Sequence, residues 1–413
     1  MKIITKVKQY PRFGLVILAF IAFIALGLPD GLLGVGWPSI RAGFSIPLDA
    51  IGMLLFASVA GYMTSSFLSG FLLSRLGVGR ILAGSCLATG LALMGYTLVP
   101  QWWMMVLLGF LAGLGAGAID AGLNTYIAAH FGEGIMQWLH ASWGVGITIG
   151  PIIMTLGLTN LDTWRFGYQI VGIFQIVLAI CFVLTLGIWN QKEEPSTSNV
   201  KKLTEYETPM SETLRQPKVW LSIVLFFLYV GAEASLGTWA YTLLTESRGV
   251  NQTLAGFFTG SYWFTFTIGR IFAGMIAKRL GVNKLVLGGL VGALLGAGLL
   301  VWNPSEIANV IAVAVIGLSI APIFPAMMSG TSMRVGDHYA ANTIGMQIMA
   351  TGFGTAVIPS LMGVLARQIS LEVIPIILLL VYIGLFGFYM LAVKLHASHA
   401  AIETAPTGTI ERS

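Results

Sequence analysis

Charged side chains are scarce in this sequence of 413 residues: only 9% are Asp, Glu, Lys or Arg, whereas 56% are hydrophobic and the mean hydropathy is +0.85. Soluble globular chains carry about 25% charged residues. The shortage excludes a soluble protein of this length and predicts an all-α polytopic membrane protein, because spanning helices satisfy their own backbone hydrogen bonds.

Cysteine is also rare, with Cys86 and Cys181 both inside apolar runs. Two such residues provide neither a disulfide framework nor the ligand spacing of a metal site, so we expect no bound metal and no cofactor. The pI of about 9.2 could indicate nucleic-acid binding. The basic residues lie at the ends of apolar runs, however, which is the orientation signal of membrane proteins. We therefore expect a lipid bilayer, and no nucleic acid, as the partner.

Twelve apolar runs are long enough to cross a bilayer. The basic arm before Phe13 resembles a signal peptide, but the following run is too long and lacks a small-residue cleavage site. The predicted units are a six-helix bundle in 1–189, a polar linker in 190–217, a second bundle in 218–395 and a disordered tail in 396–413. After the first span from Phe13, the predicted spans are 49–74, 80–98, 102–130, 137–160, 166–189, 218–245, 252–277, 284–302, 306–332, 340–368 and 373–395.

The Lys and Arg residues are distributed unequally over the two sides of this topology. Seventeen of the 22 lie on the side that holds both termini and the linker. Four lie on the other side, namely Arg41, Arg165, Arg248 and Arg367. Positively charged loops stay in the cytoplasm. We therefore predict a monomeric, multi-pass protein of the plasma or bacterial inner membrane with both termini and the linker in the cytoplasm.

One acid, Asp120, lies in the middle of the apolar run 103–129, within GLGAGAIDAGLN. An acid inside a spanning helix faces protein or water rather than lipid, which makes it a functional candidate. Asn124 follows one helical turn later and shares its face. The glycines at 113, 115, 117 and 122 are expected to let neighbouring helices approach closely. The alternative is that Asp120 only hydrogen-bonds a neighbouring helix.

The two halves of the chain resemble each other. GFLLSRLGVGR from Gly70 matches GMIAKRLGVNK from Gly274, and a nearly equal offset places Asp30 on Glu233. We interpret the chain as a duplicated six-helix unit. Two parallel six-helix repeats are the layout of transporters that alternate access around a site between the halves.

At these repeated loops the chain resembles the major facilitator superfamily, whose loop between the second and third helices has the same pattern. The family pattern places an aspartate before the arginine, whereas this sequence has Ser74 and Lys278 there. The resemblance implies that Arg75 and Arg279 contribute to gating at the cytoplasmic face. The alternative is that both arginines only anchor helix ends.

Four motifs narrow the resemblance to the fucose-proton symporter group and related glucose/galactose transporters: LPDG around Asp30, DAGLN from Asp120, HASWGVGITIGP from His140 and YVGAE ending at Glu233. The resemblance implies that the first, fourth, seventh and tenth helices line a central path. It makes Asp120 the proton-coupling site and Asp30 its partner. Glu233 is expected to bind substrate hydroxyls or protons, with helix packing as its alternative.

Sugars are bound by amides, acids and imidazoles, together with aromatic faces. The predicted substrate-binding residues are Asn124, His140, Trp143, Trp239 and Gln347. For each tryptophan, packing is the alternative role. No basic residue is expected to pair with the acids, because Arg270 lies four residues before Gly274 and is expected to reach the cytoplasmic end of its helix.

The sequence therefore predicts a non-enzymatic secondary transporter that moves a hexose or related small polar solute in symport with protons. Burial moves carboxylic acids toward proton exchange near neutral pH, as such coupling requires. Sodium coupling remains an alternative. So does drug or metabolite efflux, because the glycine-rich motif ending at Pro151 resembles an antiporter signature, although Ile152 and Ile153 replace its glycines. A membrane hydrolase lacks its motifs, and a nutrient sensor would carry a larger cytoplasmic addition.

Overall fold

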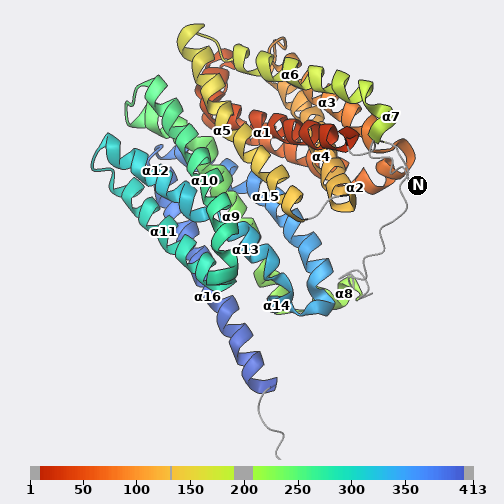
Figure 1. Ribbon diagram of the computed structural model, residues 1–413. Helices are drawn as coiled ribbons and strands as arrows, with labels where there is room; N and C mark the ends of the chain where they lie inside the picture. The colour runs from red at the N-terminus through yellow and green to blue at the C-terminus, as the bar shows by residue number, and fades with distance from the viewer. Residues whose placement is uncertain (1–9, 131–132, 190–207, 404–413) are drawn as a thin grey trace, which may run out of the picture.

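The computed structural model of the chain describes residues 10–130, 133–189 and 208–403 (Figure 1). Within these ranges the regular structure is helical, without a strand. The elements of the first half are α1 (Tyr10–Phe44), η1 (Leu48–Ala50), α2 (Ile51–Leu76), α3 (Val78–Tyr96), α4 (Trp102–His130), α5 (Glu133–Asn160), α6 (Arg165–Leu184) and α7 (Leu186–Trp189). Those of the second half are α8 (Met210–Thr213), α9 (Pro217–Thr242), η3 (Leu243–Ser247), α10 (Gln252–Leu280), α11 (Val282–Trp302), α12 (Glu306–Ile320), α13 (Ile323–Ser329), α14 (Thr331–Val335), α15 (Asp337–Gln368) and α16 (Val373–Glu403).

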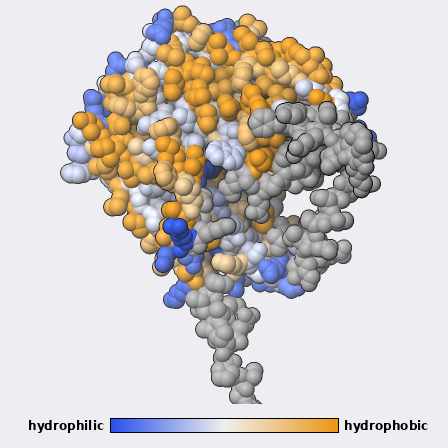
Figure 2. Space-filling view, in the orientation of Figure 1, coloured by the Kyte–Doolittle hydropathy of each residue, from blue (hydrophilic) through white to orange (hydrophobic). Residues whose placement is uncertain are grey.

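Apolar helices of spanning length dominate the structure. Eleven candidate spans in the described residues are long and apolar enough to cross a membrane. α10 is as long as most of them, with 29 residues, but is more polar and contains Arg270. Figure 2 shows apolar residues over most of the visible face and hydrophilic residues toward its rims. The predicted fold class, an all-α polytopic membrane protein with two six-helix pseudo-repeats, is confirmed.

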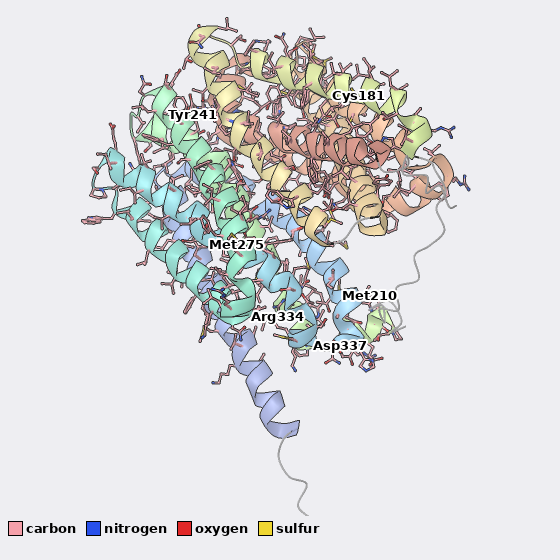
Figure 3. All side chains as sticks on the ribbon, in the orientation of Figure 1. Cys181, Met210, Tyr241, Met275, Arg334 and Asp337 are labelled. Atoms are coloured by element: carbon pink, nitrogen blue, oxygen red, sulfur yellow. The ribbon has the colours of Figure 1, made fainter. Side chains whose placement is uncertain are left out.

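The two ends of the bundle are named here by the chain. The linker side is the end where α1 and α9 begin, and the far side is the end where α1 ends and η3 lies. In Figure 3, Tyr241 lies toward the far side, whereas Met210, Arg334 and Asp337 lie toward the linker side.

Three segments differ from the predicted spans. The predicted span 306–332 is interrupted after Ile320, with α13 starting only after Pro322, because proline lacks the N–H that continues a helix. α16 continues to Glu403, so the beginning of the predicted disordered tail is helical. The last residues of the predicted linker are held against α15, since Asn342 donates hydrogen bonds to Thr208 and Thr213. The rest of the linker, 190–207, lies outside the described residues.

Close packing of α2 against α4 depends on two of the predicted glycines. A Cβ at Gly113 would lie 2.0 Å from the Ser58 carbonyl oxygen, and one at Gly117 would lie 2.3 Å from that of Tyr62. The two backbones are therefore in direct contact, as small residues permit in membrane bundles. This contact brings Tyr62 on α2 next to Asp120 on α4.

The most extensive contacts between the two halves join α5 with α10, α2 with α15 and α1 with α9. Figure 1 shows the first half, in red to yellow, beside the second half, in green to blue. Toward the far side the α1–α9 contact is so close that a Cβ at Gly34 would lie 2.2 Å from the Gly237 carbonyl oxygen. Asp30 on α1 and Glu233 on α9 lie on the linker side of this contact, whereas Trp239 lies beyond it toward the far side.

Candidate functional site

Asp120 is bound from two directions in the middle of the bundle. The Tyr62 hydroxyl donates a hydrogen bond to one of its carboxylate oxygens. The Asn124 amide donates to the other oxygen at 2.8 Å and to the Asp120 carbonyl at 3.0 Å. The predicted common face of Asp120 and Asn124 is thus confirmed. Tyr62 was not predicted, although it is the only tyrosine in the apolar run that forms α2.

Asp30 of α1 lies within electrostatic range of the same tyrosine. Its side chain is exposed although it lies within the span 14–44. The Trp143 indole is its hydrogen-bonding neighbour, and its charge acts on the Tyr62 hydroxyl. The two acids predicted to act together, from α1 and α4, therefore share one phenol as a common neighbour.

His140 and Trp143 extend this group along α5. The His140 side chain is exposed and packs edge-on against Phe23 of α1, with ring centroids 5.6 Å apart. It interacts electrostatically with both Asp120 and Arg270. His140 therefore lies within electrostatic range of both the acid of the first half and a cation of the second half.

Glu233 and Arg270 are the charged residues that the second half contributes. Glu233 is only 8% exposed, and its Oε2 atom has no hydrogen-bond partner among the described residues. Tyr262 donates a 2.9 Å hydrogen bond to the Glu233 backbone carbonyl, which fixes α9 against α10. The charge of Arg270 acts on Glu233. These two residues, together with Asp30, Tyr62, Asp120, Asn124, His140 and Trp143, are called the central polar cluster.

The prediction for Arg270 is wrong. Its guanidinium carbon lies 4.3 Å from the ring centroid of Phe266 and 5.8 Å from that of Trp143. Trp143 itself packs edge-on against Trp263 at 6.2 Å. Arg270 therefore stacks between the halves instead of reaching the end of its helix, since aromatic faces attract a guanidinium away from water. Its signal in the sequence was its position as the only charged residue inside the run 252–277.

Trp239 and Gln347, predicted to bind substrate, lie outside the cluster. Trp239 is fully buried, and its indole donates to the Pro359 carbonyl at 2.9 Å. Gln347 is also fully buried; its amide donates to Ser222 at 2.6 Å and accepts from Thr331 at 3.2 Å. The polar groups of both residues are occupied inside the second half, which favours packing roles; substrate binding by these two residues stays a prediction.

The two arginines predicted to gate the linker side make no contact that joins the halves within the described residues. Arg75 is exposed and lies over Phe71 of its own helix, with its guanidinium carbon 4.2 Å from the ring centroid. Arg279 is exposed near the end of α10. Their gating role remains a prediction for another conformation.

Ion pairs between the halves occur on the far side instead. Arg41 at the end of α1 lies 2.6 Å from Glu246 of η3. Arg367 at the end of α15 lies 3.0 Å from Asp49 of η1. Both arginines are among the four basic residues that the charge count placed on the far side. Basic residues are rare on that side, and this rarity was the sequence signal that could have pointed to these ion pairs.

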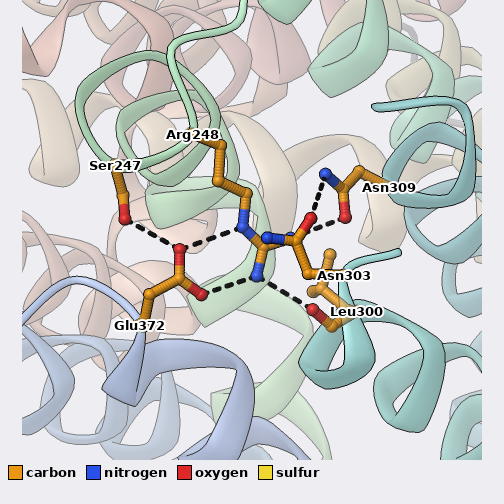
Figure 4. Close-up of polar contacts among 6 residues, drawn as sticks. All are labelled: Ser247, Arg248, Leu300, Asn303, Asn309 and Glu372. Atoms are coloured by element: carbon orange, nitrogen blue, oxygen red, sulfur yellow. Dashed lines mark hydrogen bonds and ion pairs between the residues drawn. The ribbon is translucent and has the colours of Figure 1, made fainter. Parts of the chain in front are cut away.

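A third far-side arginine organises the second half alone. The Arg248 guanidinium donates to Glu372 at 3.0 and 2.7 Å, to Asn309 at 2.6 Å and to the Leu300 carbonyl at 2.9 Å (Figure 4). Ser247 donates to the same carboxylate at 2.7 Å. Hydrogen bonding to Arg248 holds the pKa of Glu372 below its usual value. The far-side loops of the second half are thus joined at one buried cation.

Comparison with known proteins identifies the family. The model of the Major Facilitator Superfamily matches residues 15–359 and 240–409. The chain therefore belongs to the major facilitator superfamily. It is a multi-pass membrane transporter for a small molecule and not an enzyme.

Individual relatives are distant and differ in name. Bypass of stop codon protein 6 of Saccharomyces cerevisiae is 23% identical, over 88% of this chain and 79% of its own length. The glucose/mannose transporter GlcP of Bacillus subtilis is 22% identical, over 85% of this chain and 87% of its own. Sodium-dependent glucose transporter 1 of Homo sapiens is 22% identical, over 83% and 72%. The narrower resemblance to fucose-proton symporters remains a prediction.

A solved structure shows the same fold. A bacterial homologue of the human lysosomal transporter Spinster, in an inward-facing and occupied conformation, superposes with a TM-score of 0.76 at 14% identity. The match covers 94% of this chain and 98% of the other.

Proposed function

We propose that this transporter moves a hexose or a related sugar in symport with protons, by alternating access between its two halves. The observation that carries the proposal is the hydrogen-bonded Tyr62–Asp120–Asn124 group, with Asp30 within electrostatic range of Tyr62. Acids inside spanning helices mark proton and substrate paths in transporters. The sugar class is supported by relatives named as glucose transporters.

Asp120 is the proposed proton-coupling residue and Asp30 its partner. As a carboxylate, Asp120 accepts from both Tyr62 and Asn124, whereas a protonated acid becomes a donor to one of them. A proton on the oxygen that faces Asn124 would release the Asn124 amide, at the position where a sugar hydroxyl would bind, whereas a proton on the other oxygen would reverse the hydrogen bond with the Tyr62 hydroxyl. His140 and Trp143 are proposed to contribute an imidazole and an aromatic face to the same sugar.

The moving units are proposed to be 1–189 and 218–395, connected by 190–217, with 396–413 as a tail. The excess of Lys and Arg on the linker side supports a cytoplasmic linker and cytoplasmic termini. The pairs Arg41–Glu246 and Arg367–Asp49, and the Gly34–Gly237 contact, all close the far side. The described conformation is then the one that faces the cytoplasm.

Sodium is the second candidate coupling ion, because one relative is named a sodium-dependent glucose transporter. Carboxylate and carbonyl oxygens bind hard cations as well as protons. The proposed test therefore varies both ions.

The test is a flux measurement in proteoliposomes with a pH-sensitive dye outside and a panel of hexoses. Addition of a transported hexose should raise the external pH, and Asp120→Asn should abolish this response. The control is Asp162→Asn, which removes an exposed carboxylate outside the cluster at a residue with φ 51°, a conformation that Asn tolerates. Hexose uptake that needs sodium and moves no protons would show that sodium, and not the proton, is the coupling ion. A response to lipophilic cations alone would contradict sugar transport.

A further inference from the structure

Arg270 is the one cation of the central polar cluster whose charge is fixed, and the described residues leave its Nε–H group without an acceptor. It is in stacking contact with Phe266 and Trp143. Its Nε atom is buried and has no hydrogen-bond partner among the described residues. Glu233 is close enough for its charge to interact, but no ion pair within 4.0 Å joins the two residues in the described ranges.

Arg248 of the same half shows how the chain treats an arginine that is purely structural. With a side chain only 3% exposed, Arg248 donates to a carboxylate through two nitrogens, and also to a side-chain amide and a backbone carbonyl. Arg270 has none of these acceptors among the described residues. A guanidinium inside a membrane bundle is costly without an anion, so such a group marks a site where a partner arrives.

The aromatic contacts position this cation. Its guanidinium carbon lies over the rings of Phe266 from its own helix and Trp143 from the opposite half. A guanidinium is planar and presents paired N–H groups that match the two oxygens of a carboxylate. Neutral sugar hydroxyls do not need a fixed positive charge.

We propose that Arg270 binds a carboxylate group of the substrate, so that the transported class is sugar acids of the hexuronate type in preference to neutral hexoses. This inference rests on the proposed sugar transport and adds the charge of the substrate to it. Arg270 is the carboxylate-binding residue, and Asn124, His140 and Trp143 receive the rest of the sugar.

Proton coupling follows from the charges around the site. Three acids against one fixed cation would repel an anionic substrate if all were ionised. A proton on Asp120 or Asp30 removes one negative charge, and binding of the proton then favours binding of the sugar acid. The titratable and charged groups that face Arg270 and its neighbours are Asp30, Tyr62, Asp120, His140, Tyr229, Glu233, Tyr262 and Tyr382.

The experiment compares D-glucuronate with D-glucose, which differ at C6 by a carboxylate in place of a hydroxymethyl group. Binding to the purified protein and proton-coupled uptake into proteoliposomes are measured for wild type, Arg270→Gln, Arg270→Lys and the control Lys284→Gln, which removes an exposed charge from α11. Wild type should prefer glucuronate, and Arg270→Gln should weaken glucuronate binding by about tenfold or more. Glucose binding should change little in Arg270→Gln, and Lys284→Gln should resemble wild type for both ligands.

Each other result has a defined meaning. If wild type takes up glucose with protons and does not prefer glucuronate, the inference is overturned and the proposed function stands. Equal losses of both ligands in Arg270→Gln, at unchanged thermal stability, would also overturn it. If neither ligand is bound or moved, the proposed function itself fails. Arg270→Lys retains the charge without the planar fork, so partial recovery of glucuronate binding supports direct contact.

Discussion

Arg41 of α1 and Glu246 of η3, which lie 205 residues apart in the sequence, form an ion pair of 2.6 Å between the two halves. Both side chains are 29% exposed. The pair lies further along the same two segments than the Gly34–Gly237 backbone contact, so the far side is closed by charge and by close packing together. An arrangement in which the halves separate here must break this pair.

Glu246→Gln is therefore expected to favour opening of the far side. A partly exposed ion pair contributes up to about 1 kcal/mol, which corresponds to a change of about fivefold in a conformational equilibrium. We expect the labelling of Ser360→Cys, which faces Gly52 of the other half, by a membrane-impermeant maleimide to accelerate by up to that factor. The charge-exchanged variant Arg41→Glu/Glu246→Arg should restore slow labelling. Unchanged labelling in Glu246→Gln would show that the Arg41–Glu246 pair does not hold this side closed.

Tyr62→Phe removes one donor from Asp120 without changing the shape of the side chain. A hydrogen bond to a charged group contributes about 1.5–3 kcal/mol, so we expect sugar-driven proton flux to fall by about tenfold or more. Tyr241→Phe, at the far-side end of α9 (Figure 3), is the matched control. If proton flux in Tyr62→Phe equals that in the control, the Tyr62 hydroxyl is not needed for proton coupling.

Trp239→Phe tests the packing role that the structure favours for this residue. The variant loses the 2.9 Å hydrogen bond to the Pro359 carbonyl and part of a fully buried ring. We expect stability to fall by about 1–3 kcal/mol, seen as a lower Tm, with sugar affinity unchanged. Reduced sugar affinity at unchanged Tm would indicate that Trp239 binds substrate, as the sequence predicts.

The Arg248–Glu372 pair should make far-side stability sensitive to acid. The hydrogen bond from Arg248 lowers the pKa of Glu372 in the folded protein, so the stabilisation is complete above the unfolded value and is lost as pH falls through the folded value. The Tm difference between wild type and Glu372→Gln should stay constant from neutral pH down to about pH 5, shrink below the unfolded value of about 4.3, and disappear once the pH lies below the lowered folded value. A difference that persists in acid would indicate that the carboxylate charge is not responsible.

The spans were predictable because apolar length and flanking charge decide them. The third span was expected at 80–98 and is Val78–Tyr96, and the ninth was expected at 284–302 and is Val282–Trp302. The break at Pro322 was missed, since hydropathy remains high across it and only the missing N–H interrupts the helix.

The site was predictable where it depends on one helix. Asp120 and Asn124 share a face because they are one turn apart. The presence of Tyr62 and Arg270 in the site depends on which face of a neighbouring helix packs against them. The spacing of residues along the sequence does not determine this packing. Trp239 was predicted to bind substrate because of its residue type alone. Its burial in the second half and its hydrogen bond to the Pro359 carbonyl could not be predicted from the sequence.

The central claim is that Asp120 couples sugar movement to protons, and the most direct measurement compares exchange with accumulation in Asp120→Asn. Proteoliposomes are loaded with the transported sugar for counterflow, or kept empty under an imposed pH gradient for uphill uptake. We predict that Asp120→Asn retains counterflow, which needs no net proton movement, and loses accumulation, whereas wild type shows both. Accumulation of sugar by Asp120→Asn under the pH gradient would contradict the assignment of Asp120.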